Sequence, residues 1–67
     1  MRFRTQRKKA GLAVAEVAQA LRVSEAAVYQ WETGVSFPAG KRLVDIARLY
    51  GCTVDELLQA EGTPERP

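Results

Sequence analysis

The first ten residues of the chain carry five cationic side chains and no acidic one: Arg2, Arg4, Arg7, Lys8 and Lys9. Guanidinium and ammonium groups at this density can bind phosphates, so the cluster is compatible with a nucleic-acid partner. A solvated helix surface has the same composition, and the cluster by itself favours that simpler interpretation. The remaining residues carry five basic and eight acidic side chains, so the net charge of +2 conceals an uneven distribution.

The chain is poorly supplied with groups for catalysis or metal binding. It has no histidine, and Cys52 is its only cysteine. A zinc site within one chain is therefore excluded, and we expect no metal and no other cofactor. There is no glycine-rich phosphate loop and no pair of carboxylates spaced for a cleft, so we expect the protein not to be an enzyme. Cys52 is expected to be a small buried hydrophobic residue.

Length and composition predict one small globular domain. A chain of 67 residues has room for one hydrophobic core. Its 46% hydrophobic and 27% charged residues are ordinary for a soluble protein and argue against disorder. No apolar run approaches the roughly 20 residues that span a membrane, and the N-terminus lacks the apolar segment of a secretory signal. The single thiol and the absence of that signal favour the cytoplasm.

Hydrophobic periodicity predicts five helices and no strand. We expect helices at residues 2–10, 14–21, 25–32 and 40–50, and a fifth after a capping box at residues 53–56. In the first helix Phe3 and Ala10 point inward, with Arg7 between them on the same stripe. The domain is expected to span residues 1–61. Residues 62–67 contain two prolines and no apolar period, which predicts a flexible tail.

The most informative segment runs from Val17 to Gly34 and predicts two short helices joined by a tight turn. Val17 and Leu21 lie on the inner face of the first of these helices, and Val28 and Trp31 on the inner face of the second. This is the helix-turn-helix plan, in which the second helix lies in the major groove of DNA. Trp31 is expected in the core rather than as a platform for stacked bases.

An ordered set of segments extends this pattern over most of the chain. The segments are residues 7–12 (RKKAGL), 17–21 (VAQAL), 23–24 (VS), 28–34 (VYQWETG), Pro38, 43–47 (LVDIA) and 55–58 (DELL). Together they resemble the lambda-repressor-like DNA-binding domain, the XRE or Cro/CI helix-turn-helix family. The resemblance implies a compact all-α domain of five helices, with the helix-turn-helix at the second and third. It also implies a cytoplasmic regulator of bacterial or phage type.

The resemblance further implies an ion pair between the first and third helices. The family pairs an arginine late in the first helix with a glutamate at the end of the recognition helix, and Arg7 and Glu32 occupy those positions. Arg7 also lies on the inward stripe of its helix, where an unpaired charge would be costly. We therefore expect an Arg7–Glu32 pair that clamps the two helices together. The alternative is two separately solvated charges.

In the family, DNA is read by the exposed face of the third helix, which maps onto Glu25, Ala26, Ala27, Tyr29 and Gln30. Gln30 could bond the N6 and N7 edge of adenine, and Ala26 or Ala27 could touch a thymine methyl group. Glu25 could accept from the cytosine N4 amine, although nearby phosphates repel a carboxylate. Tyr29 could bond a phosphate. For each residue the alternative is an exposed position without a ligand.

The sequence departs from the family at three places that usually bind phosphate. Ala13 and Val14 replace the polar N-cap and the glutamine that opens the second helix, and residues 35–37 carry no charge. Arg22 stands where glycine commonly ends that helix, in a left-handed conformation that costs a larger residue roughly 1 kcal/mol. The cations that could replace the lost contacts are Arg4, Lys8, Lys9, Arg22, Lys41 and Arg42. Because phosphate contacts supply most of the sequence-independent affinity, we expect the monomer to bind weakly.

Apolar residues at positions that are often polar in the family raise the question of assembly. Phe37 is expected to pack over Trp31 and the fourth helix; alternatively Val14, Val35 and Phe37 form a patch for a partner. The Leu57-Leu58 pair is another candidate seam, unless it only closes the core. A two-fold homodimer on DNA would place two recognition helices about 34 Å apart and read a near-palindrome.

The leading hypothesis is sequence-specific binding of double-stranded DNA, as a small transcriptional repressor or regulator that reads an operator through the third helix. No membrane and no small-molecule ligand is expected as a partner. The alternative is a protein-interaction module on the same fold, such as an antirepressor or an accessory subunit, with weak or no DNA binding. Binding that weakens steeply with salt would favour the first hypothesis.

Overall fold

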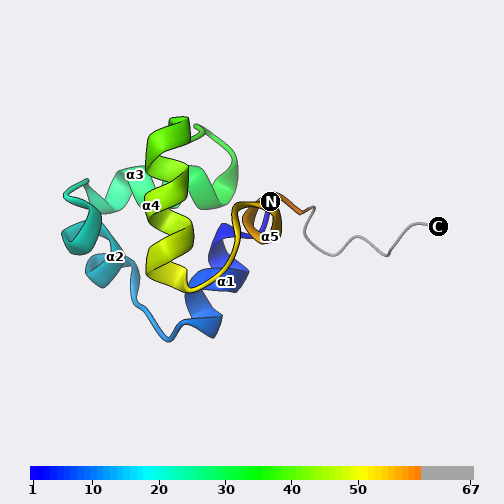
Figure 1. The fold of residues 1–67 in the computed structure, drawn as a ribbon. Helices are drawn as coiled ribbons and strands as arrows, with labels where there is room; N and C mark the ends of the chain where they lie inside the picture. Colours follow the sequence, from blue (N-terminus) through cyan, green and yellow to red (C-terminus); the bar gives the residue numbers. More distant parts are fainter. Residues whose placement is uncertain (60–67) are drawn as a thin grey trace.

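The computed structural model describes residues 1–59 of the chain. They form five helices: α1 (Phe3–Lys9), α2 (Val14–Leu21), α3 (Glu25–Thr33), α4 (Gly40–Tyr50) and α5 (Val54–Leu58). Figure 1 shows α4 crossing in front of α3, with α5 beside the N-terminus. This described part contains no strand, and the all-α prediction is confirmed. None of its helices is long and apolar enough to cross a bilayer. The predicted tail and domain end lie outside the described residues.

The helix bounds follow the sequence pattern closely. α2 and α4 have the predicted bounds, α1 is shorter by one residue at each end, and α3 is longer by one. The prediction that Ala10 faces the core is wrong, and Ala10 is exposed. Because α1 ends at Lys9, Ala10 already belongs to the turn, which continues through Gly11 with a φ of 75°. The buried face of α1 instead includes Gln6.

Local hydrogen bonds explain where α3 and α5 begin. Ser24 Oγ accepts from the Ala27 amide at 3.1 Å and caps α3. At α5 both halves of a capping box form, because the Glu56 amide donates to Thr53 Oγ1 at 3.1 Å and Glu56 Oε1 accepts from the Thr53 amide at 2.8 Å. A cap of this kind contributes about 1 kcal/mol. These caps fix the start of the second helix of the helix-turn-helix and the start of the last described helix.

The beginning of α2 has only half of such an arrangement. Ala13 has no side-chain acceptor, but Glu16 Oε1 accepts from the Ala13 amide at 2.8 Å. This contact was not foreseen from the sequence. It satisfies one amide and also places a carboxylate in the first turn of α2, where a DNA phosphate would otherwise meet only the positive end of the helix dipole.

Two arginines lie at the turn between α2 and α3, one of them within it and the other on α4. Arg22 has a φ of 61° and a ψ of 44°, the left-handed conformation expected from its position. Arg42 of α4 donates from Nη1 to the Leu21 carbonyl at 2.9 Å, and so satisfies one of the free carbonyls at the end of α2. The phosphate contact expected of Arg42 stays a prediction, and one of the guanidinium nitrogens is already used inside the domain.

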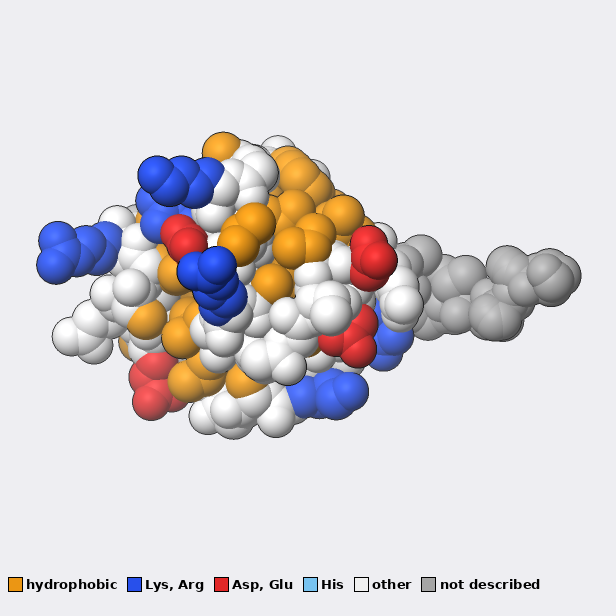
Figure 2. Space-filling model, in the orientation of Figure 1, with side chains coloured by type: hydrophobic (Ala, Val, Ile, Leu, Met, Phe, Trp, Pro, Cys, Tyr) orange, Lys and Arg blue, Asp and Glu red, His pale blue; other side chains and the backbone are white. Residues whose placement is uncertain are grey.

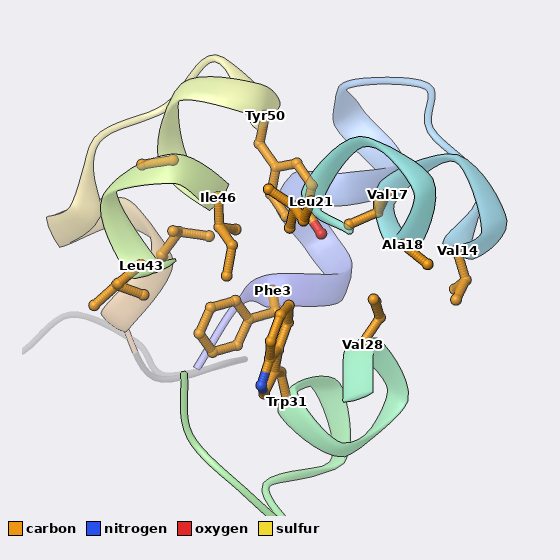
Figure 3. Close-up of a cluster of buried hydrophobic side chains, with 12 residues drawn as sticks. Phe3, Val14, Val17, Ala18, Leu21, Val28, Trp31, Leu43, Ile46 and Tyr50 are labelled. Atoms are coloured by element: carbon orange, nitrogen blue, oxygen red, sulfur yellow. The ribbon is translucent and has the colours of Figure 1, made fainter. Parts of the chain in front are cut away.

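The core lies between all five helices and is built from one stripe of each (Figure 3). Its buried hydrophobic members are Phe3, Val14, Val17, Ala18, Leu21, Val28, Trp31, Leu43, Ile46, Ala47, Tyr50 and Leu57. Trp31 is therefore a core residue, as expected. Val14 is only 8% exposed, so it cannot belong to a partner patch. Burial of one such large side chain contributes roughly 1.5–3 kcal/mol, and α3 is anchored to the core by two of them.

Phe37 packs differently from the prediction. Its ring meets the ring of Phe3 edge to face, with centroids 6.3 Å apart and an interplanar angle of 72°. The side chain remains 54% exposed rather than being covered. Of the two leucines in α5, Leu57 is fully buried whereas Leu58 is 40% exposed. Only Leu57 closes the core.

Candidate nucleic-acid interface

The outer face of α3 consists of Glu25, Ala26, Tyr29 and Gln30, all of which are exposed. They share one side of the helix because positions three and four apart lie on the same face. Ala27 differs from its neighbour, since it is partly buried and packs against the core. Of the two alanines proposed for a thymine methyl contact, Ala26 is thus the one whose methyl group is presented to solvent.

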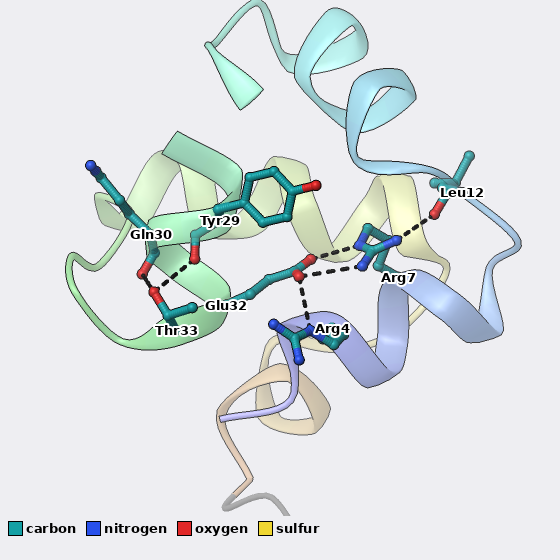
Figure 4. Close-up of polar contacts among 7 residues, drawn as sticks. All are labelled: Arg4, Arg7, Leu12, Tyr29, Gln30, Glu32 and Thr33. Atoms are coloured by element: carbon teal, nitrogen blue, oxygen red, sulfur yellow. Dashed lines mark hydrogen bonds and ion pairs between the residues drawn. The ribbon is translucent and has the colours of Figure 1, made fainter. Parts of the chain in front are cut away.

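Gln30 lies where α3 ends, and the following loop folds back onto it. Its backbone carbonyl accepts from the Val35 amide at 2.9 Å and from Thr33 Oγ1 at 3.4 Å. Ser36 Oγ donates to the side-chain Oε1 at 3.5 Å. Thr33 Oγ1 also donates to the Tyr29 carbonyl at 2.9 Å (Figure 4). The roles of Thr33 and Ser36 were missed from the sequence, because hydroxyl residues near the end of a helix are common without such contacts.

Arg7 and Glu32 meet beneath this face. Arg7 Nε lies 2.6 Å from Glu32 Oε2, and Arg7 Nη2 donates to Glu32 Oε1 at 3.3 Å. The third guanidinium nitrogen, Nη1, donates to the Leu12 carbonyl at 2.9 Å. The Glu32 side chain is only 1% exposed. Its hydrogen bond raises the pKa of Arg7 above the usual value despite burial, which lowers it. The structure thus brings the two expected partners together.

Arg4 is a second cation on the same carboxylate. Its Nε lies 3.2 Å from Glu32 Oε1, while half of its side chain is exposed. Figure 4 shows both arginines reaching Glu32 from α1. The single negative charge of Glu32 thus faces the positive charges of Arg4 and Arg7. The three side chains together carry one excess positive charge, and Arg4 is the more exposed of the two arginines. The sequence analysis assigned Arg4 to phosphate and did not foresee this ion pair.

A hollow of about 440 Å³ lies between α1, the start of α2 and the start of α3. Its walls include Arg4 and Lys8 of α1, residues 13–15 at the start of α2, and Tyr29 of α3. A guanidinium, an ammonium and a phenol hydroxyl are all groups that bond phosphate oxygens. Glu25 also lines the hollow and opposes an anion. The hollow therefore offers phosphate contacts with only a modest excess of positive charge.

The other predicted phosphate residues lie farther apart. Lys9 is exposed at the end of α1, Arg22 is exposed at the turn between α2 and α3, and Lys41 is exposed in the first turn of α4. They do not share the hollow that Arg4 and Lys8 line. The structure therefore gathers two of the predicted cations beside Tyr29 and leaves the others spread over three elements.

Tyr50 and Cys52 are suited to the core rather than to chemistry. Burial raises the pKa of Tyr50 to about 12, with a further contribution from the charge of Glu32. Burial also raises the pKa of the Cys52 thiol, which is partly covered by the core. A raised pKa keeps that thiol protonated and weakly nucleophilic. Among residues 1–59 no three His, Cys, Asp or Glu side chains cluster to hold a metal ion.

Comparison with known proteins gives one match. A family model described as a helix-turn-helix domain matches residues 1–60. No curated protein and no solved structure showed a significant match. The matched range covers nearly the whole chain and includes every element described above, which agrees with the resemblance found in the sequence.

Proposed function

This chain belongs to the helix-turn-helix domain family, and we propose that it binds double-stranded DNA sequence-specifically as a small transcriptional regulator. In this proposal α3 enters the major groove and the protein represses by occupying an operator. Regulators of this kind need no catalysis, and helix-turn-helix domains are typically not enzymes. As a bacterial or phage-type regulator it would act in the cytoplasm, where the DNA lies.

The observation that carries the proposal is the division of α3 into two faces. Val28 and Trp31 are buried, and Glu32 is held by two arginines, so the helix cannot rotate in place. The opposite face is exposed and presents Glu25, Ala26, Tyr29 and Gln30. A rigid helix with an exposed outer face can be presented to base edges without first reorganising its backbone.

Specific roles follow from the chemistry of that face. We assign Gln30 to an adenine edge and Ala26 to a thymine methyl group. Tyr29, Lys8 and Arg4 would bond the phosphates that pass over the hollow beside them. Glu25 would disfavour phosphates close to it and accept only from a cytosine amine. Lys9, Arg22 and Lys41 would add contacts according to the path of the DNA.

The affinity of one copy is expected to be low. α3 has no lysine or arginine for the common guanine contact, and the loop after it has no charge. Two copies on a near-palindrome would add their contacts, with recognition helices about 34 Å apart. A homodimer on DNA is therefore part of the proposal.

The second candidate, a protein-interaction module, is favoured by the exposed Val35 and Phe37. A salt series distinguishes the two functions. The first function predicts that affinity for DNA fragments falls steeply between about 50 and 200 mM salt. The logarithm of the binding constant should fall with the logarithm of the salt concentration, with a slope of roughly −0.9 per phosphate contact. The absence of DNA binding even at low salt would contradict the first function and leave the second.

A further inference from the structure

A second hollow, of about 390 Å³, lies between the beginning of α1 and the last turn of α3. It shares Arg4 and Glu32 with the hollow beside Tyr29 and is otherwise lined by different residues. Its volume lies within the range of sites that hold small molecules in proteins. We propose that this hollow binds a small organic carboxylate and that the bound ligand weakens DNA binding. The second half of this inference rests on the proposed function.

The indole nitrogen of Trp31 is the observation that points to a ligand. Trp31 lines this hollow and is only 7% exposed. Among residues 1–59 nothing accepts a hydrogen bond from its Nε1, yet this atom is not sealed in the core. Figure 3 shows the nitrogen at the end of the ring that points away from Ile46 and Tyr50. A buried indole N–H usually has a partner, so Trp31 offers a free donor at the wall of the hollow.

Arg4 supplies further donors to the same hollow. Its ion pair with Glu32 uses Nε, and the terminal nitrogens Nη1 and Nη2 have no hydrogen bond or ion pair with residues 1–59. Figure 4 shows both terminal nitrogens pointing away from Arg7. The two terminal nitrogens of a guanidinium form a fork that matches the two oxygens of a carboxylate. Arg4 would therefore bind the carboxylate, and Trp31 would donate to the same ligand.

The end of α3 limits the charge of the ligand. No backbone amide among residues 1–59 donates to the carbonyls of Trp31, Glu32 or Thr33. Free carbonyls at the C-terminus of a helix carry partial negative charge. Arg4, Arg7 and Glu32 together carry one excess positive charge, which a single negative charge balances. A monocarboxylate therefore suits this hollow better than a phosphate dianion.

Met1 gives the hollow an apolar wall. Its side chain lines the hollow and is 43% exposed. A methionine side chain is flexible and polarizable, so it can adapt to the shape of a hydrocarbon group. The ligand would thus carry a small hydrocarbon group beside its carboxylate, as phenylacetate and hexanoate do. The sequence analysis expected no small-molecule ligand, because this hollow forms only where α1 lies against the end of α3.

Arg4 couples this hollow to the DNA interface. It lines both hollows, and in the proposed function it bonds a DNA phosphate. A guanidinium fork that holds the carboxylate of the ligand cannot bond the phosphate at the same time. Ligand and DNA therefore oppose each other, and each should lower the affinity of the other by the same factor, about fivefold.

A nuclear magnetic resonance titration of the whole chain, without DNA, tests the site. Trp31 is the only tryptophan, so the single indole N–H resonance reports on the hollow directly. Phenylacetate should shift this resonance with a dissociation constant on the order of 1 mM. Phenylacetamide, which lacks the charge, and inorganic phosphate at the same ionic strength should bind at least about tenfold more weakly.

Three variants locate the binding. Arg4→Gln should weaken phenylacetate binding at least about tenfold, whereas Arg48→Gln, which alters an exposed arginine of α4, should leave it unchanged. Figure 2 shows hydrophobic side chains exposed over α4 and the loop that precedes it, where a hydrophobic acid could rest instead. Val44→Ser removes one such side chain, which is 42% exposed, and should not alter the titration. Circular dichroism establishes that each variant is folded.

The effect on DNA is measured separately, at constant ionic strength. Saturating phenylacetate should lower the affinity for DNA about fivefold in the wild type and leave Arg4→Gln unaffected. A Trp31 resonance that does not move, equal binding of phenylacetamide, or full binding by Arg4→Gln would overturn the site. An unchanged DNA affinity would overturn the coupling. The titration contains no DNA, so a chain that binds no DNA would contradict the proposed function and the coupling while the site stands.

Discussion

Arg7 and Glu32 join α1 to the last turn of α3 through two nitrogen–oxygen contacts, the shorter of them 2.6 Å. The pair lies directly beneath the outer face of α3. It orients that face relative to the cationic residues of α1, so the fold and the proposed DNA interface depend on the same contact.

Removal of the carboxylate should therefore destabilise the domain. Glu32→Ala leaves the mostly buried Arg7 without its partner, and loss of one member of a buried ion pair costs about 3–5 kcal/mol. Urea unfolding followed by circular dichroism measures this change. Glu25→Ala, an exposed glutamate on the same helix, is the control and should cost less than about 1 kcal/mol. Equal stabilities of the two variants would show that the pair contributes little.

Alkaline pH should destabilise the fold through the buried phenol of Tyr50. The pKa of Tyr50 is about 12 in the folded chain and 10.0 for the ordinary side chain. The unfolded chain loses this proton first, so the stability is fully present below pH 10 and falls as the pH rises toward 12, by up to about 3 kcal/mol. Tyr50→Phe should flatten this dependence, whereas Tyr29→Phe should not. A dependence that survives in Tyr50→Phe would assign it to another group.

Gln30→Ala should relax the sequence preference at one base pair of each half-site. Loss of a bidentate base contact costs about 1–3 kcal/mol of discrimination and leaves phosphate contacts in place. Competition binding with single-base variants of the preferred site measures it. Gln19→Ala, an exposed glutamine on α2, should leave the preference intact. An unchanged preference in Gln30→Ala would remove this residue from the reading face.

Lys8 and Arg42 should separate binding from folding. Lys8→Ala removes a proposed phosphate contact and should reduce the salt slope of DNA binding by about 0.9 without a change in stability. Arg42→Ala removes the donor to the Leu21 carbonyl and should cost about 1.5–3 kcal/mol of stability. The same urea titration and the same salt series serve both variants. A loss of stability in Lys8→Ala together with a reduced salt slope and unchanged stability in Arg42→Ala would contradict this assignment.

Arg22→Gly tests whether the left-handed arginine is retained for DNA. Glycine adopts this conformation freely, so the variant should unfold no more easily than the wild type and up to about 1 kcal/mol less easily. DNA affinity should fall, because a cation at the turn is lost. A variant with unchanged DNA affinity would show that Arg22 does not contact phosphate.

The sequence was sufficient for the helices and for their inner faces, because apolar periodicity and capping residues act locally. The hydroxyl and carboxylate of the Thr53–Glu56 box are three residues apart and were predictable for that reason. The role of Arg42 was not predictable, because its acceptor, the Leu21 carbonyl, lies 21 residues away at the end of another helix. The prediction that Ala10 faces the core was wrong because α1 ends at Lys9, one residue before it.

In the candidate site, too, some features could be predicted from the sequence and others depend on contacts between distant parts of the chain. The family pattern predicted the pair of Arg7 and Glu32, and it also predicted the exposed face of α3 except for Ala27, which is partly buried. The second cation on Glu32 and the contact of Phe37 with Phe3 were not expected. Both depend on how α1 lies against α3 and its loop. That relation is set by packing of the whole core and leaves no trace in the spacing of the residues involved.

Selection of bound fragments from a random pool of double-stranded DNA tests the central claim most directly. The purified chain should enrich one near-palindromic sequence, with half-sites whose centres are about one helical turn apart. The enriched sequence should carry adenine at the position relaxed by Gln30→Ala. A pool that remains random after repeated selection at low salt would contradict sequence-specific DNA binding by this protein.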